Sequence, residues 1–286
     1  MAYDILVLGG GPAGLAAAIA ARGRNKSVLV IGNRDSPLAR AERVDNYPGL
    51  PGRSGQELLE ELRRHAQTLG AEFVVGKALS LLAWNGFSAT VGSQVYQGRA
   101  LILAPGVVRT DKYPGEAEYL GRGVSYCATC DGMLYRNKPV TVVGLAPDAP
   151  LEANYLSGLG CQVVYVSPQP PEGLAEGIPY VRAEKLAVKG EQAVTALEAD
   201  GALLPCAGVF ILRPAVAPTD LLPALETEGG FIKVDRRMAA NVPGVFAAGD
   251  CTGAPLQVSK AVGEGHVAAL SACEYLEQQE HKSDAP

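Results

Sequence analysis

The feature that most constrains the fold is a glycine turn between a strand and a helix near the start of the chain. Tyr3 to Leu8 is a short run rich in β-forming residues, and Gly9-Gly-Gly-Pro-Ala-Gly14 follows it directly. An alanine-rich helix is expected to run to about Arg24, and a second strand from Ser27 to Ile31. A strand, a turn, a helix and a strand in this order predict parallel strands in a doubly wound α/β sheet.

Gly9, Gly11 and Gly14 form the pattern G-x-G-x-x-G, which is typical of dinucleotide-binding turns. One glycine permits the tight turn, one lets the backbone approach a pyrophosphate, and one allows the helix to pack closely on the strand. The helix N-terminus, with Pro12 and Ala13 beside it, offers free N–H groups and a partial positive charge to phosphates. We therefore predict a dinucleotide site at this turn.

The second strand ends without the acidic residue that usually holds a ribose. Gly32 and Asn33 stand at that place, and Asp35 follows shortly after. Asn33 can still hydrogen-bond a ribose hydroxyl, although less strongly than a carboxylate does. We expect Asn33 to be part of the site.

The same topology is expected a second time. A strand at Val140 to Val143 leads into a turn at Gly144, a helical stretch at about 151–159 and a strand at 162–166. The length of 286 residues also fits two domains. Further on, 180–212 resembles a hairpin region, 245–250 a strand that ends in Gly249-Asp250, and about 263–279 a last helix. The fold class is therefore α/β with two Rossmann-like domains.

Cys127 and Cys130 are the one close cysteine pair, because the other four cysteines stand alone in the sequence. Two intervening residues let the sulfurs close a small disulfide, and such motifs lower the pKa of a thiol. Asp131 follows and could protonate or deprotonate a leaving thiolate. A spare disulfide or half of a metal site is the alternative. We expect no metal, since a zinc site needs four ligands and there is no second Cys-x-x-Cys.

The composition is that of a globular chain, with 48% hydrophobic and 19% charged residues and a net charge of −5. The apolar stretch from Ile5 to Ala21 has no basic residue ahead of it and is broken by glycine and proline, unlike a signal peptide. It is also too short to span a membrane. We expect a cytoplasmic protein with no membrane partner and no nucleic-acid partner.

Four sequence blocks resemble the low-molecular-weight thioredoxin reductases over nearly the whole chain. In order, they are Gly9-Gly-Gly-Pro-Ala-Gly14, Val44-Asp-Asn-Tyr-Pro-Gly49, Tyr126-Cys-Ala-Thr-Cys-Asp-Gly132 and Val242-Pro-Gly-Val-Phe-Ala-Ala-Gly-Asp250. The resemblance implies an FAD-binding domain made of residues 1–111 and 243–286, with a central redox domain at 112–242 inserted between them. It also implies a homodimer.

The resemblance also implies roles for single residues. Cys130 would face the flavin, Cys127 would attack the disulfide of thioredoxin or a thioredoxin-like protein, and Asp250 would take hydroxyls of the FAD ribityl chain. The other FAD contacts are expected at Gly9, Gly11, Pro12, Ala13, Gly14, Asn33, Asn46, Ala78, Ala104, Gly106, Gly249, Gln257 and Val258.

The second nucleotide turn departs from the NADPH-dependent relatives, which have a G-x-G-x-x-A turn there and arginines after the next strand. Here Ala146 is expected to place a Cβ where a pyrophosphate needs bare backbone, and Pro147 lacks an N–H donor. After the strand, no basic residue occurs before Arg182. A 2′-phosphate would thus lose charge-assisted hydrogen bonds of about 1.5–3 kcal/mol each. We expect NADPH not to be the reductant.

The chain therefore resembles the NADPH-independent branch, the ferredoxin-dependent flavin thioredoxin reductases. The resemblance implies reduced ferredoxin, or flavodoxin, as the electron donor. Three alternatives stay open at this point: an NADPH-dependent enzyme with a divergent site, a disulfide oxidoreductase with a second flavin in its central domain, and a flavin redox sensor without turnover.

Overall fold

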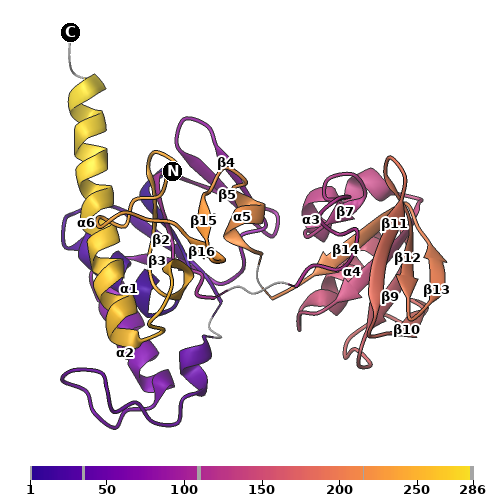
Figure 1. The fold of residues 1–286 in the computed structure, drawn as a ribbon, viewed down its shortest axis with the longest axis horizontal. Helices are drawn as coiled ribbons and strands as arrows, with labels where there is room; N and C mark the ends of the chain where they lie inside the picture. The colour runs from indigo at the N-terminus through magenta and orange to yellow at the C-terminus, as the bar shows by residue number, and fades with distance from the viewer. Residues whose placement is uncertain (1, 34–35, 108–110, 215, 284–286) are drawn as a thin grey trace. The chain divides into compact units, whose positions relative to one another are not determined.

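The computed structural model describes residues 2–33, 36–107, 111–214 and 216–283 (Figure 1). The chain forms two compact units, of which the first contains residues 1–108 and 217–286 and the second contains residues 109–216. Each unit has a parallel sheet of the Rossmann type, so the predicted α/β fold class is confirmed. Among the described residues, no helix is both long and apolar enough to cross a membrane.

The first unit is built on a seven-stranded sheet in the order β3-β2-β1-β6-β5-β4, with β17 paired to β6. Its strands are β1 (Ala2–Leu8), β2 (Val28–Ile31), β3 (Glu72–Val74), β4 (Ser80–Ala83), β5 (Phe87–Val91), β6 (Gln94–Leu103) and β17 (Val245–Ala247). Strands β3, β2, β1, β6 and β17 run parallel, with Val7 in register with Val30 and Ile102. The first half of β6 pairs with β5 and the second half with β17, so one long strand serves both parts of the sheet.

Helices cover this sheet and complete its core. They are α1 (Pro12–Arg22), α2 (Gly55–Thr68) and α6 (Val258–Ser283), with the short helices η1 (Pro37–Arg40), α5 (Pro218–Leu221) and η3 (Asp250–Thr252). Helix α2 begins with a capping box, in which Ser54 and Glu57 each accept a hydrogen bond from the other's backbone. Helices α1 and α6 touch so closely that a Cβ on Gly265 would lie 2.1 Å from the carbonyl oxygen of Ala13.

The boundary between the units differs from the expected one. Residues 217–242, which we expected in the central domain, belong to the first unit. The reason is hydrophobic burial, because Leu222, Leu225 and Ile232 pack in the same core cluster as Leu6 and Leu101. This segment also contains the small hairpin of β15 (Thr227–Glu228) and β16 (Phe231–Ile232).

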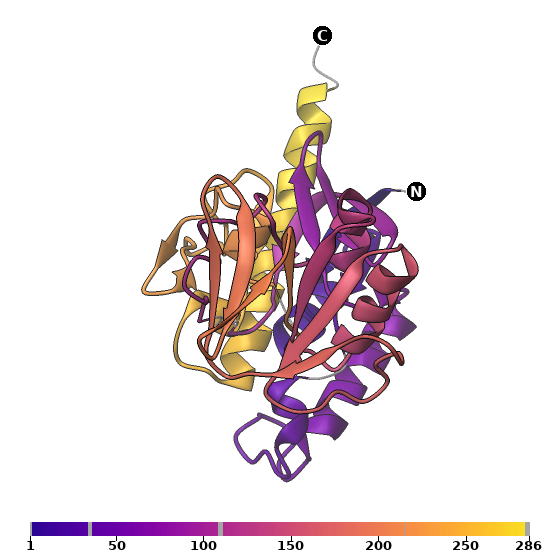
Figure 2. The same ribbon diagram turned by 90° about the vertical axis from the view of Figure 1, so that its right-hand side faces the viewer.

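The second unit combines a parallel and an antiparallel sheet (Figure 2). The parallel sheet has the order β10-β9-β8-β14-β7, and the antiparallel one has the order β11-β12-β13. The strands are β7 (Val124–Ser125), β8 (Pro139–Gly144), β9 (Gln162–Ser167), β10 (Tyr180–Arg182), β11 (Leu186–Gly190), β12 (Val194–Ala199), β13 (Ala202–Pro205) and β14 (Gly208–Leu212). The helices are α3 (Ala128–Asp131), η2 (Gly132–Tyr135) and α4 (Ala149–Gly158).

Two elements end or begin away from their expected bounds. The strand expected at 245–250 stops at Ala247, because Gly249 adopts a φ of +87° that only glycine reaches easily. The last helix starts at Val258 and not at about residue 263, and it extends to Ser283.

Candidate active site

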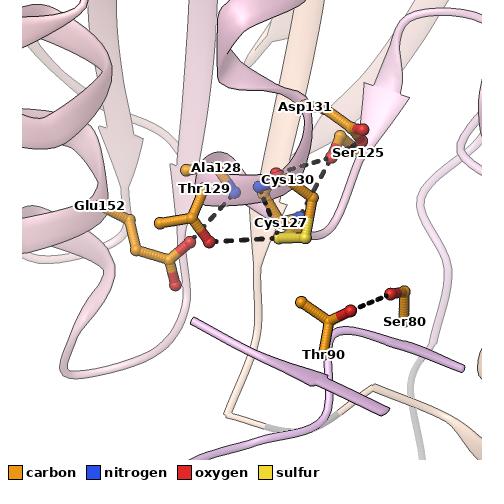
Figure 3. Close-up of a disulfide and its surroundings, with 9 residues drawn as sticks. All are labelled: Ser80, Thr90, Ser125, Cys127, Ala128, Thr129, Cys130, Asp131 and Glu152. Atoms are coloured by element: carbon orange, nitrogen blue, oxygen red, sulfur yellow. Dashed lines mark hydrogen bonds between the residues drawn. A yellow bond between two sulfur atoms is a disulfide. The ribbon is translucent and has the colours of Figure 1, made fainter. Parts of the chain in front are cut away.

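The redox pair lies in the second unit, directly after strand β7 (Figure 3). Cys127 is the residue ahead of helix α3, and Cys130 lies within that helix. The two sulfurs form a disulfide with a Cα–Cα distance of 5.3 Å. Cys127 is only 4% exposed, whereas Cys130 is exposed. In the oxidised pair, Cys130 therefore offers the sulfur that an external reductant can reach.

Two donors surround the sulfur of Cys127. The backbone N–H of Cys130 donates to it at 3.0 Å. The hydroxyl of Thr129 lies 3.5 Å away and must be the donor, since a disulfide sulfur carries no hydrogen. Both donors would stabilise a thiolate on Cys127 when the bond is broken by attack on Cys130.

Asp131 is held by a buried serine. Ser125 Oγ donates to Asp131 Oδ2 at 2.6 Å, and it accepts the backbone N–H of Cys127 at 3.1 Å. The carboxylate is thus linked to the main chain of Cys127 through one hydroxyl. On the other side of α3, Glu152 of α4 accepts the N–H of Ala128 at 3.2 Å.

In the first unit, the predicted cofactor residues gather at one edge of the sheet. Gly9 follows β1, Asn33 follows β2, Ala104 follows β6 and Gly249 follows β17, so all four lie at the carboxyl ends of parallel strands. Ligands of open α/β sheets bind outside this edge, next to the point where the strand order reverses. The reversal here lies between β1 and β6.

The glycine turn fits a dinucleotide phosphate. A Cβ on Gly9 would lie 1.9 Å from the carbonyl oxygen of Ala104, and a Cβ on Gly14 would lie 2.0 Å from that of Gly9. Both glycines are therefore required by the fold. A Cβ on Gly11 would meet nothing closer than Ser36 Oγ at 3.9 Å, so the space over this residue is open to a ligand. Helix α1 has no side-chain cap and no acidic residue in its first turn, which leaves its N–H groups for an anion.

This geometry predicts opposite outcomes for two alanine substitutions. Gly14→Ala should destabilise the first unit by about 2 kcal/mol or more, because the added methyl overlaps backbone. Gly11→Ala should change stability by less than about 1 kcal/mol but weaken flavin binding by about tenfold, since the methyl occupies the open space. Urea unfolding of the flavin-free protein and the flavin-to-protein absorbance ratio after gel filtration measure the two effects. Flavin retention by Gly11→Ala equal to wild type would show that no phosphate lies over this residue.

A charged network holds the turn that contains Gly249 and Asp250. Lys260 Nζ donates to the carbonyl oxygens of Gly249 and Gly253, both at 2.7 Å, and pairs with Glu264 at 3.0 Å. Glu264 in turn accepts the N–H of Gly249 at 2.9 Å. Burial raises the pKa of Asp250, which lies half-buried beside this network.

The remaining predicted contacts occupy different surroundings. Asn46 Nδ2 donates to Gln257 Oε1 at 2.7 Å, so two residues 211 positions apart meet. Gly106 has a φ of +75° in the loop after β6, and Val258 begins α6. Ala78 is 9% exposed and packs in a core cluster, so its side chain serves the fold. Asp35 lies outside the described residues.

Several supporting residues were not anticipated from the sequence. They are Ser125, Thr129, Glu152, Lys260 and Glu264. Ser125 and Thr129 flank Cys127 closely enough that a search for donors around the pair could have found them. Among the residues described here, no group of three His, Cys, Asp or Glu side chains could hold a metal ion.

Comparison with known proteins shows the family to which the chain belongs. The family model of the pyridine nucleotide-disulphide oxidoreductases matches residues 3–265. A thioredoxin reductase of Aquifex aeolicus is 37% identical over 274 residues, which cover 87% of this chain and 85% of the relative. The crystal structure of a ferredoxin-flavin thioredoxin reductase from Clostridium acetobutylicum has a TM-score of 0.86 at 42% identity, covering 96% of this chain and 98% of that one. An atypical thioredoxin reductase from Desulfovibrio vulgaris Hildenborough has a TM-score of 0.72 at 33% identity, with 97% and 99% covered. The chain therefore belongs to the pyridine nucleotide-disulphide oxidoreductase family and, within it, to the thioredoxin reductases, flavoproteins whose cofactor is FAD.

Proposed function

We propose that this protein reduces the disulfide of thioredoxin through Cys127 and Cys130, with electrons from reduced ferredoxin and not from NADPH. The observation that carries the choice of donor is the contrast between the two nucleotide folds. In the first unit, helix α1 begins at a bare Gly11 and has no acidic residue in its first turn. In the second unit, helix α4 begins after Asp148 and has Glu152 in its first turn.

Two carboxylates at a helix N-terminus act against binding of a pyrophosphate. The partial positive charge of a helix N-terminus favours an anion, and a resident carboxylate both offsets that charge and repels the phosphate. Glu152 already accepts the N–H of Ala128, which ties it to the redox helix α3. The first turn of α4 thus supports the redox pair where a pyridine nucleotide would need a phosphate site.

The inner side of the second turn is filled by protein. Ala146, which we expected to project into the phosphate site, is only 7% exposed and packs in a core cluster with Tyr165. The space next to Gly144 is taken by the Tyr165 hydroxyl, which lies 1.8 Å from where a Cβ would be. Burial, with the charges of Tyr180 and Asp148 as lesser causes, raises the pKa of Tyr165 to about 12. The turn therefore differs from the first one in packing as well as in charge.

One observation favours an NADPH-dependent enzyme. Arg182 is distant in sequence from the end of β9. It lies on the neighbouring strand β10, in register with Ser167 at the end of β9. Adjacent strands are about 4.8 Å apart. The expected loss of charge partners for a 2′-phosphate counted Arg182 as distant, whereas strand pairing brings it to this edge. A single exposed arginine does not offset the repulsion of a phosphate by the two carboxylates at the N-terminus of α4. Ferredoxin therefore remains the proposed donor.

The energetics allow a ferredoxin donor. The reduction potential is about −400 mV for plant-type ferredoxins and about −270 mV for thioredoxin. The transfer of two electrons from ferredoxin to thioredoxin is therefore favourable by roughly 6 kcal/mol. When bound, FAD supplies a group that takes up electrons singly and releases them as a pair. Two of the solved structures similar to this chain are ferredoxin-flavin thioredoxin reductases, which supports the same donor.

The donor is tested by anaerobic bleaching of the flavin absorbance with NADPH, NADH and reduced ferredoxin in separate samples. We expect ferredoxin to bleach the flavin within seconds, and both pyridine nucleotides to leave it oxidised for at least about a hundred times longer. Photoreduction of the same sample is the control that the flavin can be reduced. Rapid bleaching by NADPH would contradict the proposed donor, and Arg182→Ala would then be expected to raise the KM for NADPH.

The number of FAD molecules per chain and the oligomeric state can each be measured directly. A count of one FAD per chain is expected, and a count of two would favour the reading with a second flavin. The homodimer implied by the family resemblance stays a prediction, which sedimentation equilibrium would test.

A further inference from the structure

We propose that Ser125 is a positioning residue that joins the carboxylate of Asp131 to the main chain of Cys127. Ser125 is 4% exposed and is one of few buried polar residues in the described part of the chain. Its hydroxyl donates to Asp131 Oδ2 at 2.6 Å and accepts the Cys127 N–H at 3.1 Å. The inference rests on the proposed use of Asp131 as acid and base at the Cys pair, but not on the electron donor.

The hydrogen bonds form a directed chain. A hydroxyl has one hydrogen, and an ionised carboxylate 2.6 Å away is a better acceptor than the Cys127 carbonyl oxygen at 3.2 Å. The order is therefore Cys127 N–H to Ser125 Oγ, and Ser125 O–H to Asp131. Each bond polarises the next in such a chain. Ser125 thus fixes the direction of the Asp131 carboxylate and the position of Cys127 at the same time (Figure 3).

The ionisable groups near Asp131 explain why the hydrogen bond from Ser125 is important. The ionisable groups on the helices packed most closely against α3 are Tyr135 on η2, and Glu152 and Tyr155 on α4, with Asp148 just ahead of α4. None of these is a cation. Ser125 therefore supplies a hydrogen-bond donor that orients this carboxylate, and Ser125→Ala removes it.

The consequence concerns thiol–disulfide exchange. In the reduced pair, a cysteine thiol gives its proton to a base, and the thiolate attacks the thioredoxin disulfide to form a new S–S bond. The thioredoxin thiolate that leaves then takes up a proton. With Ser125 in place, the Asp131 carboxylate is held in one orientation relative to Cys127 and is positioned to accept the first proton. Without Ser125, the carboxylate loses the hydrogen bond that fixes this orientation.

The test is a double-mutant cycle on single-turnover oxidation of pre-reduced enzyme by thioredoxin disulfide, which needs no ferredoxin. Ser125→Ala is expected to slow the transfer about tenfold at pH 7. In an Asp131→Asn background, Ser125→Ala should have little further effect, because Ser125 acts through Asp131. Ser125→Thr, which keeps a hydroxyl, should recover most of the rate.

The controls separate this role from folding. Ser271→Ala removes the buried serine of α6 in the first unit and should leave the rate of transfer unchanged. Independent, additive effects of Ser125→Ala and Asp131→Asn would overturn the proposal, as would a Ser125→Thr variant no faster than Ser125→Ala. Cys127→Ser is measured alongside. Full transfer by that variant would overturn the proposed function itself, whereas its loss together with additive effects at Ser125 would overturn only the positioning role.

Discussion

Replacing Cys130 with serine is expected to lower the rate of thioredoxin reduction by about a thousandfold or more. Cys130 carries the exposed sulfur of the disulfide, and a serine there can neither form the bond nor accept electrons through it. Cys127→Ser should cause a loss of similar size. Steady-state reduction of thioredoxin with the proposed donor measures both. A Cys130→Ser variant as active as wild type would instead favour the alternative of a flavin redox sensor.

The two variants should differ in the reactivity of the thiol that remains. Cys127→Ser leaves the exposed Cys130, which iodoacetamide should alkylate readily. Cys130→Ser leaves Cys127, which is 4% exposed in the oxidised structure and should react at least about tenfold more slowly. Cys273→Ala is a matched control, because this cysteine is fully buried in α6 of the first unit and its loss should not change activity.

The division of labour between the two cysteines can be read from the same variants. The family resemblance implies that Cys127 attacks thioredoxin, yet Cys127 is the buried sulfur in the oxidised pair. Its sulfur must therefore become accessible after reduction if the implied role holds. A stable mixed disulfide with a one-cysteine thioredoxin is expected for Cys130→Ser and not for Cys127→Ser. The opposite result would assign the attack on thioredoxin to Cys130.

The parts of the fold that follow from local patterns could be predicted from the sequence. The turn Gly9 to Gly14 and the strand before it have their own signal, and the structure shows Gly9 and Gly14 packed against backbone as the pattern requires. The Cys pair likewise needs only two residues and their spacing. These features depend on neighbours in sequence, which a pattern can contain.

Features that depend on distant parts of the chain could not be predicted. Arg182 returns to the end of β9 only through strand pairing, and Glu152 reaches Ala128 only because α4 packs beside α3. The segment 217–242 joins the first unit because Leu222 and Leu225 fill a core built from other strands. The same limit explains why the bond between Asn46 and Gln257 was not foreseen, although both residues were expected in the site.

Breaking the ion pair of Glu116 and Arg213 is expected to destabilise the second unit by about 3–5 kcal/mol. Glu116 is fully buried, and Arg213 holds both carboxylate oxygens at 2.6 and 2.8 Å. Burial alone would lower the pKa of Arg213, but the hydrogen bonds and charge of Glu116 outweigh it and raise that pKa. A variant that removes one partner leaves the other charge buried and unpaired.

Because of its position, the loss of this ion pair should also affect the chain connections and the redox turn. Arg213 also donates to the carbonyl oxygen of Asp111 at 3.3 Å, so it joins the segment where the chain enters the second unit to the segment where it leaves. Tyr126, the residue before Cys127, donates to Glu116 at 2.9 Å. Both chain connections and the start of the redox turn are therefore joined to this one ion pair.

Thermal or urea unfolding of Glu116→Gln and Arg213→Met measures the effect, and a melting temperature lower by about 10 °C or more is expected. The double variant should be more stable than either single variant, because no unpaired charge is left buried. The pair of Lys189 and Glu198 is a matched control in the same unit, with side chains 49% and 36% exposed, and its removal should cost less than about 1 kcal/mol. If the double variant lost as much unfolding free energy as the two single variants together, the loss would come from packing, and the buried charge would not be its cause.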